Sequence, residues 1–235
     1  QIHVEQMYKM SLSEQDTLVF SGALVDPQRP IDLSDGWNWI GYLPNSPLRT
    51  DDALGSLENG LYVKGLTAFA DFYAGYGWFG GLELMHPYEG YLLKMSDSES
   101  LIYPAGSLVR GDWDHSEKVV YAENGWAVDA SDFEFNGSIT FDFDDIPLDH
   151  MDSIAAFVGD ECRGVGSVMQ FPITGKNVVL MMVYSDLSEG EVLSIKAENS
   201  QTGEVYYMNE KIIFSSDMVH GNALEPVIMT KKYIK

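Results

Sequence analysis

The chain has 235 residues, of which 45% are hydrophobic and 12% aromatic, and this composition can build one large core or two smaller ones. It carries 14 Lys and Arg against 36 Asp and Glu, which gives a formal net charge of −22. Such an acidic chain repels phosphate groups, so we expect no nucleic-acid binding and no membrane insertion. No apolar run approaches the roughly 20 residues that a membrane-spanning helix needs.

The first half is rich in Gly, Tyr and Trp, and it predicts short strands joined by turns. Residues 36–42 alternate between the two faces of a strand, with Trp37 and Trp39 on one face and Ile40 on the other.

A short helical turn is predicted over residues 51–57, with Thr50 or Asp51 as its cap and acidic residues at its start. Strands are expected over residues 61–64 and 68–73. No segment shows convincing helical periodicity over a longer stretch, so the sequence predicts an all-β chain.

A repeat is visible in the first half. The run Lys-Met-Ser at 9–11, followed by an apolar run at 18–22, recurs as Lys-Met-Ser at 94–96 followed by 101–106. Each copy predicts a β-hairpin, because two apolar runs flank an acidic, Ser-rich turn. The first copy resembles the end of a preceding unit in a longer array.

The second half predicts an immunoglobulin-like antiparallel β-sandwich, because short strands follow one another at ~8–12-residue spacing. Asn136 and Gly137 form either a tight hairpin turn or a bend in one long strand. The expected strands cover residues 133–135, 138–143, 153–158, 162–166, 177–184, 191–197, 204–207, 212–214 and 226–229.

The composition changes near residues 104–118, from a Gly-, Tyr- and Trp-rich first half to longer alternating strands with Asp-rich connections. We therefore expect two modules, an irregular β-domain with a short helical turn at 1–106 and the sandwich at 107–235. Cys162 is the only cysteine, so no intrachain disulfide is expected. The chain begins at Gln1 without an initiator Met, which predicts a removed signal peptide or an excised fragment and favours export.

Several of these runs resemble a Trp-rich repeat module of large secreted or surface proteins from Gram-negative gut and marine bacteria. The second half, through Ala-Ala-Phe-Val-Gly-Asp-Glu-Cys-Arg-Gly-Val at 155–165, is similar to a β-sandwich module of such proteins. The runs that carry the first resemblance are GWNWIGY at 36–42, the Ala53-Leu54 turn, YVK at 62–64, YGWFG at 76–80, Gly90-Tyr91 and LIYP at 101–104.

The resemblance implies an extracellular, non-catalytic module that neighbours other modules of a larger bacterial surface or secreted protein. It supplies no catalytic residues and no ligand. One departure concerns the turn before Gly90, where the repeats often carry Gly and this chain has Tyr88 and Glu89.

Catalytic patterns are weak in the sequence, so we expect a chain that is not an enzyme. Cys162 lies beside Asp160 and Glu161, which oppose a reactive thiolate, and we expect an inert, half-buried thiol. The five histidines are widely spread, and no recognised metal motif contains them. A glycan-active enzyme fragment remains an alternative, because 36 acidic residues offer many carboxylate pairs.

No cofactor is expected, and a structural calcium ion is one hypothesis for the acidic residues of the second half. Asp142, Asp144, Asp145 and Asp149 lie at the end of a strand and in the loop that follows it. Carboxylate oxygens in such loops are typical calcium ligands, although no complete calcium-loop pattern is present. A solvated acidic edge is the other interpretation.

Exposed aromatic rings are the strongest candidates for ligand contact. Tyr76 and Trp78 lie in a glycine-rich turn, and Trp113 lies between two aspartates. Rings of this kind stack on the apolar faces of sugars while polar side chains bind the hydroxyl groups. The competing interpretation places most rings, including Trp37, Trp39 and Phe79, in the core of a small β-domain.

The sequence thus predicts an extracellular or cell-surface module of a bacterial protein, with adhesion or carbohydrate binding as its function and a glycan or a surface protein as its partner. A purely structural spacer is the alternative.

Overall fold

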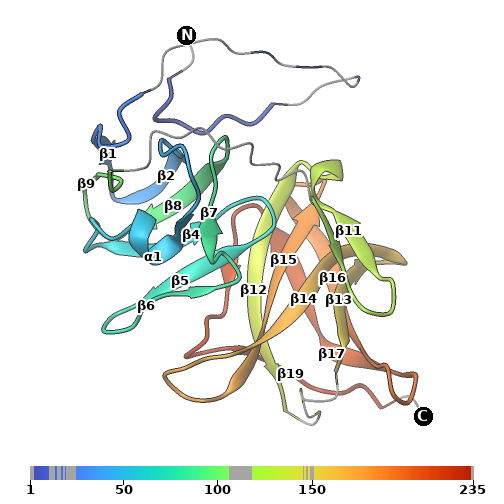
Figure 1. Ribbon diagram of the computed structural model, residues 1–235. Coiled ribbons are helices and arrows are strands. Elements are labelled where there is room, and N and C mark those ends of the chain that lie inside the picture. The colour runs from blue at the N-terminus through green and yellow to red at the C-terminus, as the bar shows by residue number, and fades with distance from the viewer. Residues whose placement is uncertain are drawn as a thin grey trace. The chain divides into compact units, whose positions relative to one another are not determined.

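The computed structural model describes residues 3–10, 14, 17, 19, 25–105, 118–144, 146, 148 and 151–233. Strands, paired mostly in antiparallel fashion, dominate these residues (Figure 1). The predicted all-β fold is therefore confirmed.

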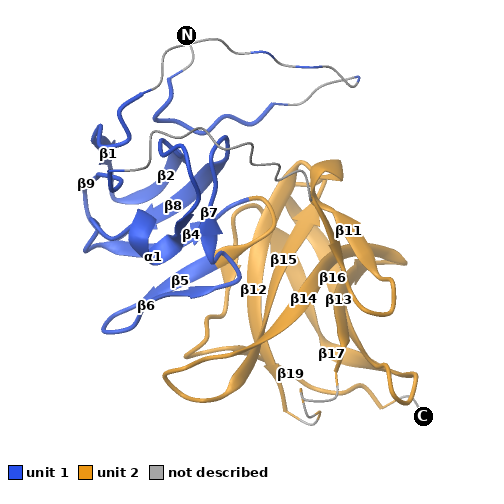
Figure 2. Cartoon of the chain, in the orientation of Figure 1, with its two compact units in different colours: residues 1–65, 70–115 blue, residues 66–69, 116–235 orange. Residues whose placement is uncertain are grey.

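The chain divides into two compact units, which are coloured separately in Figure 2. Unit 1 comprises residues 1–65 and 70–115, and unit 2 comprises residues 66–69 and 116–235. The expected boundary between 106 and 107 lies outside the described residues, so the division into modules 1–106 and 107–235 stays a prediction.

Unit 1 contains a five-stranded sheet, two ribbons of two strands each and one helical turn. The sheet has the order β2-β8-β4-β5-β6, with β2 (Gly36–Gly41), β8 (Gly90–Met95), β4 (Gly60–Lys64), β5 (Phe69–Tyr73) and β6 (Gly77–Gly80). The ribbons pair β1 (Ile31–Leu33) with β9 (Glu99–Leu101), and β3 (Leu48–Arg49) with β7 (Leu84–Met85).

One face of this sheet is a core face. Ile40 on β2 lies opposite Tyr91 on β8, and the neighbouring Leu93 lies opposite Val63 on β4. All four side chains are buried. Successive residues of a strand point to opposite faces. Because Ile40 is buried on the core face, Trp37 and Trp39 lie on the other face of β2.

The helical turn α1 (Thr50–Ala53) is present, but its predicted cap is wrong. Arg49 is the N-cap residue and makes no side-chain capping bond. The Thr50 hydroxyl instead donates to the Leu82 carbonyl at 2.6 Å, and the Asp51 carboxylate accepts from the backbone N–H of Trp78 at 2.8 Å. Thr50 thus ties the loop after β6 to the turn, and Asp51 ties β6 itself to it.

The hairpin expected at residues 94–106 is also not formed. β8 pairs with β2 and β4, whereas β9 pairs with β1 in a separate ribbon. The local pattern predicted both strands correctly. Each strand, however, pairs with strands that are distant in the sequence and not with the adjacent one. The first copy of the repeat, at 9–11 and 18–22, lies largely outside the described residues.

Unit 2 is built around an eight-stranded sheet with the order β17-β16-β13-β14-β15-β12-β18, in which β19 also pairs with β12. A hairpin of β10 (Val119–Tyr121) and β11 (Ala127–Asp129) and the 3-10 turn η1 (Ala130–Asp132) precede it. The strands of the sheet are β12 (Phe135–Phe143), β13 (Ser153–Val158), β14 (Glu161–Gln170), β15 (Asn177–Ser185), β16 (Glu189–Asn199), β17 (Glu204–Ser215), β18 (Val219–His220) and β19 (Val227–Met229).

The sheet folds over on itself at β14. The first half of this strand, up to Val165, pairs with β13, and the second half, from Gly166, pairs with β15. A Cβ atom on Gly166 would lie 2.7 Å from Cγ1 of Val179, so a larger residue does not fit at the corner. The result is sandwich-like, with two layers that remain continuous through β14.

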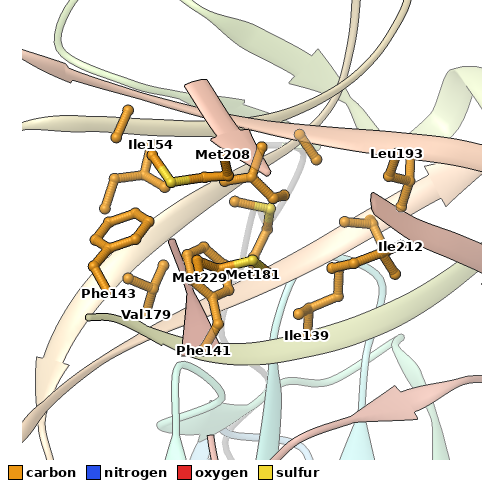
Figure 3. Packing of buried hydrophobic residues seen from close by; sticks show 14 of the residues in the cluster. Ile139, Phe141, Phe143, Ile154, Val179, Met181, Leu193, Met208, Ile212 and Met229 are labelled. Carbon is orange, nitrogen blue, oxygen red and sulfur yellow. The ribbon is translucent and has the colours of Figure 1, made fainter. Parts of the chain in front are cut away.

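The core of unit 2 lies between these two layers (Figure 3). Its members recur at every second position along each strand, as expected for strands with one buried face. Asn136 and Gly137 lie within β12, opposite Tyr184 and Val183, so they belong to one long strand. The cluster includes Ile139, Phe141 and Phe143 of β12, Val179 and Met181 of β15, Ile154 of β13, Leu193 of β16, Met208 and Ile212 of β17, and Met229 of β19.

The C-terminal segment runs along part of β12 and part of β17. β19 pairs with β12, and the residues that follow it bond to β17. The backbone N–H of Asn209 donates to the Thr230 carbonyl at 3.0 Å, and that of Lys232 donates to the Tyr207 carbonyl at 2.7 Å. The covered stretch of β17 cannot recruit a strand from another chain, which limits aggregation through this part of the edge.

A buried cation holds the end of β14 in place. The Arg163 guanidinium lies 2.9 Å from the Glu191 carboxylate and 2.9 Å from that of Glu161, and it stacks 4.8 Å from the Phe133 ring centroid. Arg163 and Glu191 are largely buried, whereas Glu161 is exposed.

We predict that Arg163→Met destabilises the chain by about 3–5 kcal/mol, because it leaves the Glu191 carboxylate buried without its counter-charge. Lys231→Met is the control, since the ion pair between Lys231 and Glu204 is more exposed and should contribute about 1 kcal/mol or less. Urea unfolding of both variants measures the difference. Equal losses of stability would contradict the importance of the buried pair.

Asp71 on β5 is a buried acid, with 8% of its surface exposed. Burial raises the pKa of this carboxyl from 3.8 to about 7, because the charged form loses its hydration. The folded state therefore binds a proton between about pH 4 and pH 7 that the unfolded state releases, and the stability of the fold falls as pH rises through that window.

We predict that Asp71→Asn is more stable than the wild type at pH 8 by on the order of 2–4 kcal/mol, and that the difference shrinks toward pH 4. Unfolding free energies measured across this pH range test the claim. Parallel curves for the two proteins would show that Asp71 keeps its charge on folding.

We also predict that residues 1–106 and 107–235, expressed separately, each unfold cooperatively. Each unit has its own set of internal strand pairings, which is the basis for independent folding. Circular dichroism melts of the two fragments and of the whole chain provide the measurement. Two unstructured fragments beside a folded whole chain would mean that the halves share one core.

Candidate functional site

Two tryptophans of β2 face solvent, which corrects the interpretation that placed them in the core. Trp37 is 37% exposed and Trp39 is 47% exposed. Ile40 is buried on one face of β2, so the alternate positions lie on the other face, and β2 is the first strand in the order of its sheet. Phe79, assigned to the core by the same interpretation, is buried as expected.

Trp37 is fixed by its neighbours on the sheet. Its ring meets Tyr62 edge-on, with 5.8 Å between the centroids and 90° between the planes. The Lys94 ammonium lies 5.4 Å from the ring centroid, as expected from its position directly opposite Trp37 on β8. A cation over an indole ring contributes about 0.5–1 kcal/mol at an exposed site. Both contacts therefore favour the observed orientation of the ring before any ligand binds.

Both tryptophans open onto a cleft of about 600 Å³ in unit 1. Its walls come from an N-terminal segment, from the stretch that leads into β1, and from β2 itself. The lining residues are Glu5, Gln6, Met7, Arg29, Pro30, Ile31, Asp32, Leu33, Trp37, Asn38, Trp39 and Ile40.

Polar side chains in the cleft are oriented by contacts with one another and with their surroundings. Arg29 and Glu5 form an ion pair at 2.7 Å. The Ser100 hydroxyl donates to the Asp32 carboxylate at 2.8 Å, and the Tyr8 hydroxyl donates to the Gln6 side-chain carbonyl at 3.3 Å. Oriented polar groups of this kind reduce the ordering cost of binding a ligand.

Asn38 serves the shape of the turn before β2. Its side-chain carbonyl accepts from the backbone N–H of Ser34 at 2.9 Å, and its amide donates to the carbonyls of Ser34 and Gly36. Gly36 has a φ of 85°, a conformation that favours glycine. This turn fixes where β2 begins, and so it fixes the position of both tryptophans.

The backbone of β2 also contributes to the cleft. β2 is the first strand in the order of its sheet, and the N–H of Gly41 donates away from β8, to the carbonyl of Glu5 at 2.9 Å. In an antiparallel pair, backbone groups alternate between facing the partner strand and facing away from it. The N–H and C=O groups of Trp39 and Trp37 therefore also point away from β8, on the side of the cleft.

The rings predicted from the sequence lie elsewhere in unit 1. Tyr76 is 46% exposed at the β5–β6 turn, where Gly75 and Gly77 have φ values of 82° and 111°. Trp78 is half-buried, because its ring packs on Gly60, where a Cβ atom would lie 2.8 Å from the indole. Neither residue lines the cleft.

Trp113, the third predicted ring, lies outside the described residues. The assignment of Tyr76, Trp78 and Trp113 to ligand binding stays a prediction. The exposed pair on β2 carried a signal in the sequence, since alternation already placed both tryptophans on one face. The sequence did not reveal which face is buried.

The calcium hypothesis rests on four aspartates, of which two are described. The Asp142 carboxylate accepts from the backbone N–H of Phe143 at 2.8 Å, and Asp144 is exposed. Asp145 and Asp149 lie outside the described residues. Within the part of the chain that the structure describes, no group of three or more His, Cys, Asp or Glu side chains could hold a metal ion. The calcium site stays a prediction.

Cys162 is half-buried on β14. Burial raises the pKa of its thiol, which disfavours the thiolate that a nucleophile requires. The sulfur lies 3.6 Å from the Gly164 carbonyl and can donate to it. The half-buried position is the one that the sequence predicts, and the inertness of the thiol stays a prediction.

Among the described residues, no helix has the length and apolar character to cross a bilayer. Comparisons of the chain with protein-family models, with curated proteins and with solved structures found no match.

Proposed function

We propose that this chain is a non-catalytic recognition module of a bacterial surface or secreted protein, and that it binds a carbohydrate in the cleft beside Trp37 and Trp39. One observation carries the proposal. Two indole rings on the same face of an edge strand open onto a cleft with polar walls.

Sugars require this mixture of surfaces. Their C–H faces are apolar and stack on aromatic rings, and their hydroxyl groups need hydrogen-bond donors and acceptors at fixed positions. Trp37 and Trp39 supply the rings, spaced about 6.8 Å apart along the strand because they are two residues apart. Arg29, Asp32 and Gln6 supply the polar groups.

The charges of the cleft favour a neutral sugar. Its lining contains two acids, Glu5 and Asp32, against one base, Arg29. The chain as a whole has a net charge of −22, which disfavours the approach of uronic acids and sulfated sugars. We therefore expect neutral oligosaccharides to bind more tightly than anionic ones.

The extracellular and bacterial assignment rests on the sequence. The resemblance to modules of secreted and surface proteins and the acidity of the chain support it. Adhesion to a glycan-bearing surface, next to other modules of a larger protein, is the role that follows for such a chain.

A glycan array screened with the purified wild-type chain, followed by Trp39→Ala, tests the proposal. We predict that the wild type binds neutral glycans and that Trp39→Ala weakens binding by about 1–3 kcal/mol with little change in melting temperature. Trp78→Ala is the matched control. Its packed ring predicts a loss of stability, with binding retained wherever the variant folds.

Two other outcomes would change the proposed function or the proposed binding site. If no glycan binds, the spacer alternative replaces recognition. If Trp78→Ala abolishes binding and leaves the melting temperature unchanged, the platform is the β5–β6 turn with Tyr76.

A catalytic alternative has one observation in its favour, because Glu5 and Asp32 both line the cleft and glycoside hydrolysis uses a pair of carboxylates. Mass spectrometry of bound oligosaccharides distinguishes the two functions. Shortened products that disappear in Asp32→Asn would identify an enzyme.

A further inference from the structure

Two glycines face each other across β2 and β8, at the end of the cleft. Gly41 and Gly90 form a direct cross-strand pair. Neither has a φ in the left-handed region, so the backbone at these positions accepts any residue. The reason for glycine must therefore lie in what packs on the sheet there.

An N-terminal segment, residues 3–8, which we call the strap, occupies the notch that the two glycines leave. A Cβ atom on Gly41 would lie 2.2 Å from the carbonyl oxygen of Val4, and its next contacts are also with the strap. A Cβ atom on Gly90 would lie 2.2 Å from Cγ of Met7, and its other near contacts are with the same side chain. At both glycines the three nearest atoms to the missing side chain belong to the strap.

The strap is held in the notch by directed bonds as well as by shape. The N–H of Gly41 donates to the Glu5 carbonyl at 2.9 Å, and the Glu5 carboxylate pairs with Arg29 at 2.7 Å. Within the strap, the N–H of His3 donates to the Tyr8 hydroxyl at 2.9 Å. A segment with these bonds has a defined conformation against the sheet.

The docked strap builds one wall of the cleft. Glu5, Gln6 and Met7 all line it, opposite the strand that carries Trp37 and Trp39. A strap released from the notch would remove these three side chains from the site and leave the tryptophans on an open face.

We infer that Gly41 and Gly90 are positioning residues of the binding site: they seat the strap, and the ligand binds between the strap and β2. This inference rests on the proposed carbohydrate binding at the cleft. It predicts that affinity depends on two residues that do not line the cleft and bring no side chain to the ligand.

The test is Gly41→Ala in the full chain, with cellohexaose, laminarihexaose and mannohexaose as probes. Alanine is less costly than glycine within a strand, but its methyl group displaces the Val4 carbonyl. Hydrogen exchange of the residue 41 amide reports strap docking without any ligand, and calorimetric titration reports affinity. We expect faster exchange of this amide and at least about tenfold weaker probe binding, with the cooperative melt of the chain retained.

A second pair of variants controls for damage to the sheet. Gly90→Ala should also release the strap, and adding Met7→Gly removes the atoms that the new methyl group would meet. The double variant should regain slow exchange at residue 41, which reports docking of the strap without any ligand. Rescue of this kind would not follow if Gly90→Ala acted by distorting β8.

The outcomes separate the inference from the function on which it rests. If no probe binds the wild type, the proposed function fails and the inference fails with it, whatever the exchange shows. If the wild type binds a probe and Gly41→Ala exposes the amide without loss of affinity, the inference alone is overturned.

Discussion

The burial of Ile40 is the constraint on which the functional face of unit 1 depends. Ile40 packs on the core face with Tyr91 and Leu93, and the strand alternates with a period of two. Trp37 and Trp39 are thereby forced outward together. A shift of one residue in the pairing of β2 would bury both rings, expose the core residue and remove the ligand face.

The same strand joins three kinds of interaction at one site. Lys94 and Tyr62 contact the Trp37 ring from neighbouring strands. Asn38 shapes the turn before β2, and Gly41, the last residue of β2, lies under the strap. Each contact is small, but together they hold rings and polar groups in place before a ligand arrives. Preorganisation of this kind lowers the entropy that binding must overcome.

Local pattern was enough to predict much of the fold, because strands with one buried face alternate visibly. The apolar run at 177–184 became the central strand β15, and the turn at 159–160 joins β13 to β14 as expected. The sequence did not predict which distant strands pair or which face of a strand is buried. Both faces of residues 36–42 carry large apolar side chains, so the sequence could not show which face is buried.

The glycine notch was hidden from the sequence for a related reason. The notch forms because Gly41 on β2 pairs with Gly90 on β8 and because Met7 packs against Gly90. These residues are far apart in the sequence, so no local motif predicts the contact. The predicted cap residues failed similarly, since Thr50 bonds to Leu82 in a distant loop and Asp51 bonds to Trp78 on β6. Residues whose role lies in tertiary contacts look like ordinary turn or strand residues when the chain is read locally.

The most direct test of the account is fluorine NMR of the full chain labelled with 5-fluorotryptophan, in which single substitutions assign the signals of the five tryptophans. We expect the Trp37 and Trp39 signals to broaden with a soluble paramagnetic agent and to shift together as a neutral oligosaccharide is added. The Trp78 signal should change little when the sugar is added. If the Trp78 signal responds to the sugar and those of Trp37 and Trp39 do not, the cleft on β2 is not the binding site.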